Sequence, residues 1–132
     1  MSPPAGRTRS CQAADARARL LDVEAFLVAA ERVVDLGGDV VATNAVHAAI
    51  AAADAICCLR LGERSRDADH RAAVTLLARV DRDLAAALDR VLAVKTRAGY
   101  EARDVSAIDA GRCVRLATRL RDAAREAIAL GL

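Results

Sequence analysis

The chain has only two histidines and one lysine, and each stands where a side chain could move a proton or bind a phosphate. His47 lies in an alanine-rich segment, His70 follows a polar loop, and Lys95 opens the segment KTRAGYE. An imidazole can accept or donate a proton, and a nearby cation can stabilise phosphate charge. His47, His70 and Arg64 are therefore the candidate catalytic residues, although the loop that carries Arg64 is equally typical of a solvated connection.

The segment KTRAGYE also holds the only tyrosine of the chain. One interpretation is a helix end, in which Lys95 and Arg97 complement the terminal carbonyl groups and Gly99 forms a left-handed cap. The other is a ligand site, with Lys95, Arg97 and Tyr100 as contact residues. Both remain open at the level of sequence.

Polar residues also interrupt the apolar segment that precedes the loop. Asn44, His47 and Asp54 recur at spacings of three and seven, which places them on one face of a helix. That face is either the solvated side of the helix or a polar line that binds a ligand or a second subunit. Lys95 continues an apolar stripe, so it either reaches solvent at the helix end or pairs with Asp54.

Composition restricts the possible classes of protein. Of 132 residues, 55% are hydrophobic and only 2% aromatic, so alanine, valine and leucine must fill the core, as in closely packed helices. A net charge of +2 is small for a dedicated duplex-DNA binder. Phosphate-loop, dinucleotide-binding and zinc-protease motifs are not found, and no cofactor or metal is expected. The four cysteines lack metal-ligand spacing, and we expect them to be reduced, in a cytoplasmic protein with no membrane span.

Apolar periodicity predicts an all-α protein, an up-and-down bundle of four to five helices with no strand. Residues 1–9 are expected to form a flexible tail, and 10–132 a single domain. Expected helices cover 12–36, 40–61, 70–80 and 81–98, and a last one follows Ser106 to about Leu130. Asp39 and Asp69 are the expected N-caps of the second and third helices, and Ser106 with Asp109 suggests a capping box.

The order of four segments resembles the HEPN superfamily of helical domains. They are HAAIAAADAICCLRLG, RDADHRAAVTLL, KTRAGYE and VSAIDAGRCVRLA, and the resemblance spans about residues 12–130. It implies a four- or five-helix bundle that commonly forms a homodimer. It also implies either RNA cleavage without a metal, often as a toxin paired with a nucleotidyltransferase-type antitoxin, or an inactive module that binds RNA, a nucleotide or a partner protein.

The chain departs from that family at the catalytic motif. Active members carry an arginine, four to six further residues and then a histidine near the long helix, whereas no histidine follows His70 here. Arg64 and His70 have a suitable spacing, but they lie in the earlier loop. We therefore expect a catalytically degenerate binding module of the toxin–antitoxin type. The alternatives are a metal-independent ribonuclease and a purely structural scaffold protein.

Overall fold

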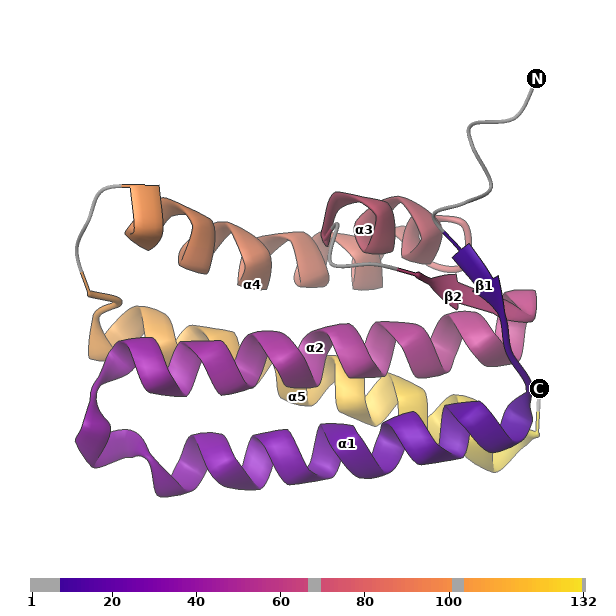
Figure 1. The fold of residues 1–132 in the computed structure, drawn as a ribbon, viewed down its shortest axis with the longest axis horizontal. Helices are drawn as coiled ribbons and strands as arrows, with labels where there is room; N and C mark the ends of the chain where they lie inside the picture. The colour runs from indigo at the N-terminus through magenta and orange to yellow at the C-terminus, as the bar shows by residue number, and fades with distance from the viewer. Residues whose placement is uncertain (1–7, 67–69, 101–103, 132) are drawn as a thin grey trace.

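The computed structural model confirms the all-α bundle. It describes residues 8–66, 70–98 and 104–131 in full, and the backbone of 99 and 100. These residues form a small sheet of two strands, one short 3-10 helix and five α-helices (Figure 1). In chain order the elements are β1 (Thr8–Ser10), α1 (Ala13–Arg32), η2 (Val34–Leu36), α2 (Gly38–Leu61), β2 (Glu63–Ser65), α3 (His70–Ala78), α4 (Arg82–Tyr100) and α5 (Ala107–Leu130).

Helix α2 is the centre of the bundle. It packs against α1 and α5 most extensively and against α3 and α4 on its other side, and Figure 1 shows it between α1 and α4. Its length and composition would allow it to cross a membrane, but 72% of its most apolar window is buried inside the fold. Of its 24 residues 14 are buried, mostly alanines, which let the neighbouring helices approach closely.

The expected helix boundaries hold to within a few residues, with physical reasons for the exceptions. The first helix ends at Arg32 rather than at residue 36, because the chain tightens into the 3-10 turn Val34–Leu36. Asp39 is not an N-cap but a first-turn residue of α2, whose Oδ1 accepts a hydrogen bond from the Val105 amide at 3.2 Å. The Ser106 cap is confirmed, since its Oγ accepts from the Asp109 amide at 3.0 Å. Asp69 lies outside the described residues.

Two expectations about the N-terminal region are wrong. Residues Thr8–Ser10 are not a tail: they pair with Glu63–Ser65 as an antiparallel ribbon beside the end of α2, with Arg9 opposite Arg64. The expectation of four reduced cysteines fails as well, because Cys11 and Cys58 form a disulfide with their Cα atoms 5.5 Å apart. Residues 1–7, the rest of the expected tail, lie outside the described residues.

A close backbone contact joins the beginnings of α2 and α5. A Cβ atom on Gly38 would overlap the backbone carbonyl oxygen of Val105, whose amide is already held by Asp39. We expect Gly38→Ala to lower the free energy of unfolding by about 2–3 kcal/mol, since a rigid backbone has to move. Gly111→Ala is the matched control. A Cβ there would lie 3.5 Å from the Arg115 side chain, so this helix-interior substitution should stabilise by about 0.5–1 kcal/mol.

Urea denaturation of the two variants measures both effects. Equal changes of the same sign at the two glycines would contradict the close approach of Val105 to α2.

Candidate functional site

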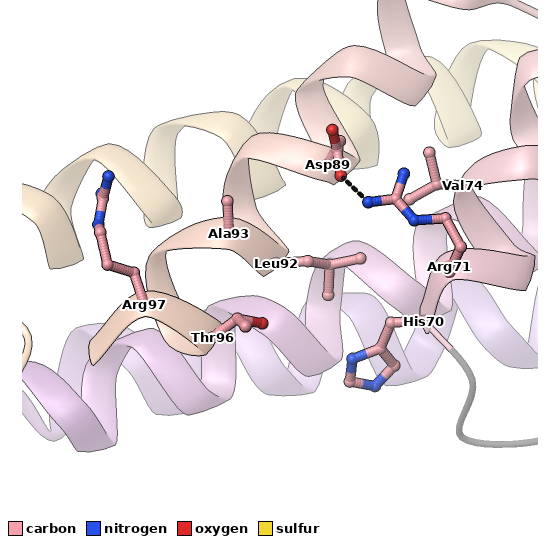
Figure 2. A pocket seen from close by; sticks show the side chains of 8 residues that line it. All are labelled: His70, Arg71, Val74, Asp89, Leu92, Ala93, Thr96 and Arg97. Carbon is pink, nitrogen blue, oxygen red and sulfur yellow. Dashed lines mark ion pairs between the residues drawn. The ribbon is translucent and has the colours of Figure 1, made fainter. Parts of the chain in front are cut away.

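Two adjoining hollows on the surface form one groove between α2, α3 and α4. Their volumes are about 540 and 280 Å³, and they share the side chains of His70, Leu92 and Thr96. His70 is the first residue of α3, whereas Leu92 and Thr96 lie one turn apart on α4, so both helices supply the shared wall. Figure 2 shows the larger hollow, with His70 and Arg71 of α3 facing the side chains of α4.

The smaller hollow brings together the chain's two histidines and its single lysine. His47 comes from α2, His70 from α3 and Lys95 from α4, and Thr43 and Thr96 add hydroxyl groups. Both histidines are exposed and Lys95 is half-buried. Three groups able to carry positive charge or a proton therefore line one open hollow, although they are distant in sequence.

The larger hollow adds two arginines and one carboxylate. Arg71 Nη2 lies 3.4 Å from Asp89 Oδ1, an ion pair that links α3 to α4 and is drawn as a dashed line in Figure 2. Arg97 lines the same hollow one helical turn beyond Ala93. Asp89 offsets part of the charge of Arg71, and the groove keeps a cationic surplus from Lys95 and Arg97.

The ring of His47 is held in place from the other side. Phe26 of α1 stacks on it, with ring centroids 5.1 Å apart and an angle of 27° between the planes. The phenylalanine thereby limits the rotation of an otherwise exposed imidazole, and fixed orientation is what a proton-transferring or hydrogen-bonding group needs. Phe26 itself does not line either hollow and therefore contributes no stacking surface to the groove.

Asp54 lies elsewhere, and the hypothesis that it pairs with Lys95 is wrong. Arg19 Nη2 lies 3.0 Å from Asp54 Oδ2, and Arg64 Nη1 lies 3.6 Å from the same oxygen. Asp54 follows His47 by two turns of α2, about 10 Å along the helix axis. Lys95, which lines the same hollow as His47, is therefore far from Asp54.

The carboxylate of Asp54 is the one charged side chain that is buried among the described residues, with 5% of the residue exposed. Burial raises its pKa above the ordinary value of 3.8, and the guanidinium groups of Arg19 and Arg64 partly offset that rise. Asp54 thus forms a structural ion-pair cluster with Arg19 and Arg64. This cluster lies next to the β1–β2 ribbon, which carries Arg64, and apart from the groove.

Two candidates remain, Asn44 on α2 and Tyr100 at the end of α4. Asn44 donates from Nδ2 to the Val40 carbonyl at 2.9 Å within its own helix, and it is not among the groove residues. Tyr100 ends α4, and its side chain lies outside the described part of the structure. Of the candidate catalytic and contact residues, the structure gathers His47, His70, Lys95 and Arg97 along the groove and separates Asn44, Asp54 and Arg64 from it.

The two free cysteines are buried and unsuited to chemistry. Burial raises the pKa of Cys57 to about 12, with the negative charge of Asp54 adding to it, and burial raises the pKa of Cys113 to about 11. At neutral pH both are therefore unreactive thiols. Among the described residues, no group of three or more histidine, cysteine or acidic side chains is arranged to hold a metal ion.

Comparison of the chain with family models, curated proteins and solved structures found no match.

Several groove residues were not among the sequence candidates. Thr43, Arg71, Asp89 and Thr96 line the two hollows, and Arg19 holds Asp54. A signal was present on α4, where Asp89, Leu92 and Thr96 recur at helical spacing together with Lys95. No comparable signal existed for the Arg71–Asp89 and Arg19–Asp54 ion pairs, because each of them joins two different helices.

Proposed function

We propose that the chain is a HEPN-like binding module that holds a phosphate-bearing ligand, single-stranded RNA or a nucleotide, in the groove between α2, α3 and α4. The observation that carries the proposal is the convergence of His47, His70 and Lys95 on one hollow, with Arg71 and Arg97 in its neighbour. Lysine and arginine bind phosphate oxygens, and an imidazole can donate a hydrogen bond to them.

The composition favours recognition of phosphates over recognition of bases. The chain has one phenylalanine, one tyrosine and no tryptophan, and Phe26 already stacks on His47. Sequence-tolerant stacking on aromatic rings, the usual means of holding bases, thus has little support here. Binding through phosphates predicts a strong dependence on salt and a weak dependence on base identity.

The resemblance to HEPN domains supports the same ligand class and suggests the setting of a toxin–antitoxin system, with a nucleotidyltransferase-type protein as the partner. The family's arginine–histidine motif is missing from the long helix, since α4 carries Lys95 and Arg97 but no histidine. For this reason we favour ligand binding over catalysis as the function of the groove.

A second candidate function is metal-independent cleavage of RNA in the same groove. The observation in its favour is that His47 and His70 line one hollow with Lys95. Two imidazoles can divide the work: one accepts the 2′-hydroxyl proton while the other protonates the leaving 5′-oxygen, and the lysine stabilises the charge on the phosphorane.

Titration of a fluorescent single-stranded RNA tests the proposal. We expect Lys95→Ala to weaken binding by about tenfold, because one charged hydrogen bond to phosphate is lost. We also expect the slope of log affinity against log salt to become shallower by about 0.7, the value for one phosphate contact to a single strand. EDTA is present throughout, and the RNA is recovered to detect cleavage.

Arg119→Ala serves as the matched control, since Arg119 is an exposed cation on α5 that does not line the groove. It should leave both the affinity and the salt slope unchanged. An equal loss of RNA affinity in Lys95→Ala and Arg119→Ala would mean that the RNA binds through the overall positive charge of the surface. That result would contradict binding in the groove. If the wild type cleaves the RNA and both His47→Ala and His70→Ala lose that cleavage, RNA cleavage is favoured over binding alone as the function of the groove.

A further inference from the structure

The Cys11–Cys58 disulfide fastens the β1–β2 ribbon to the end of helix α2. Cys11 comes directly after β1, and Cys58 lies in the last turn of α2. Without the disulfide, the ribbon would depend on its three residue pairs and on one further bond, from the Cys11 amide to the Gly62 carbonyl at 3.0 Å. A two-stranded ribbon of this size is marginally stable in water, so the disulfide decides whether it stays closed.

Strand β2 holds helix α3 at both of its ends. At the beginning of the helix, Ser65 ends β2 and precedes His70, the first residue of α3, by five positions. At the other end, Arg79 follows the helix directly, and its Nη1 lies 3.2 Å from Glu63 Oε1 of β2. Strand β2 also packs against α3, and Figure 1 shows the ribbon at the end of the bundle where α3 lies. The position of α3 therefore depends on the ribbon.

Helix α3 is fixed unevenly along its length. It has only nine residues, too few for a helix to be stable alone, and three of them are buried: Ala73, Leu76 and Leu77. The first two residues, His70 and Arg71, are exposed. They line the larger hollow of the groove, and His70 lines the smaller one as well. Release of β2 therefore loosens the first turn of α3, while the buried residues keep the rest of the helix on the core.

We propose that the Cys11–Cys58 disulfide is a redox switch for the groove, which binds a phosphate-bearing ligand tightly when the disulfide is formed and weakly when it is reduced. This inference rests on the function proposed above and adds its regulation. Reduction releases the ribbon, and His70 and Arg71 then no longer face α4 in fixed positions. Lys95 and Arg97 stay in place because α4 packs on α2 and α5, so binding is weakened rather than abolished.

A dithiol is the reductant that this switch requires. Cys11 is half-buried and Cys58 is buried, so a thiolate of the dithiol attacks the Cys11 sulfur. The bond between the two cysteines breaks, and Cys58 leaves as a thiolate that takes up a proton. The second thiolate of the dithiol then displaces Cys11 from the mixed disulfide, and Cys11 also takes up a proton. The dithiol ends as a disulfide, and the chain has gained two thiols.

Titration of fluorescent single-stranded RNA with and without dithiothreitol tests the switch. We expect reduction to weaken binding by about tenfold, as for the loss of one hydrogen bond between a charged group and phosphate. Cys11→Ser should bind as weakly as the reduced wild type and should not respond to the reductant. Lys95→Ala should still respond, since Lys95 lies on α4. Far-UV circular dichroism should show that the helices persist, and their general loss on reduction would overturn a local switch.

The imidazole NMR signals provide a second measurement that needs no RNA. Reduction should shift or broaden the signal of His70, whereas the signal of His47, which stacks on Phe26 of α1, should change much less. An equal change at both histidines, or none at His70, would overturn the route through α3.

The two measurements separate the switch from the proposed function. RNA binding that depends on Lys95 but not on reduction would overturn the switch and leave the proposed function intact. If no RNA binds in either state, the proposed function fails. A redox response of His70 would then still support control of the hollow by the disulfide, and a missing response would overturn it.

Discussion

Replacement of Cys11 with serine is expected to lower the free energy of unfolding by about 4 kcal/mol. The disulfide closes a loop between residues 47 apart, and the loss of that constraint widens the unfolded ensemble. Cys11 is half-buried and follows β1, so serine fits the site without a buried void. The β1–β2 ribbon then relies on its three residue pairs alone, and we expect it to open before the helices do.

Thiol counting and urea denaturation check this result. Without reductant the native protein should show no reactive thiol, and the unfolded protein two, from Cys57 and Cys113. Reductant should raise the unfolded count to four and lower the stability of the wild type to that of Cys11→Ser, while leaving the variant unchanged. Four reactive thiols in unfolded, unreduced protein would show that the disulfide does not form.

Arg19→Ala is expected to cost about 3 kcal/mol, because it leaves the buried carboxylate of Asp54 with the more distant Arg64 as its remaining partner. Asp54→Asn should change stability by no more than about 1 kcal/mol, since the isosteric amide removes the buried charge itself. The double variant should recover most of the loss, because the arginine is then no longer required. Arg119→Ala, which removes an exposed arginine of α5, is the matched control and should be neutral.

The pH dependence of Arg19→Ala follows from the pKa of Asp54. Burial raises that pKa in the folded protein above its unfolded value near 3.8, so the folded state binds the proton more tightly. The tighter binding of this proton therefore adds to the free energy of unfolding. Its contribution is complete below the unfolded pKa of Asp54 and is lost as the pH rises through the folded pKa. Loss of Arg19 raises the folded pKa further. The stability gap between variant and wild type should therefore narrow as pH falls toward 4, and a gap that widens would contradict the ion-pair cluster.

The local sequence predicts most of the fold. The stop at Gly62 illustrates this, because a glycine with φ of +71° ends α2 where its apolar run ends. Failures occur where a distant residue decides the local structure. Aspartate is a common N-cap residue, yet α2 begins before Asp39. The Asp39 carboxylate instead accepts a hydrogen bond from the amide of Val105, 66 residues away. The β1–β2 ribbon is likewise fixed by pairing across the chain and by the Cys11–Cys58 disulfide.

The residues of the candidate site could be predicted from their types, but their convergence on one hollow could not. Histidine and lysine are rare enough here that His47, His70 and Lys95 could be singled out, while nothing in their spacing placed them in one hollow. Helical periodicity specifies which face a residue occupies, but it does not specify which face of another helix lies opposite. The same limit explains why Asp54 was paired with Lys95, when Arg19, 35 residues away, holds it.

The most direct test of the groove is to follow the two histidine imidazoles by NMR while single-stranded RNA is added. With only His47 and His70 in the chain, each signal can be assigned from the corresponding alanine variant. If the groove binds phosphate, both signals should shift together and saturate at the same RNA concentration, and Lys95→Ala should move that saturation to higher RNA. Saturable binding of RNA with neither imidazole shifted would contradict the account.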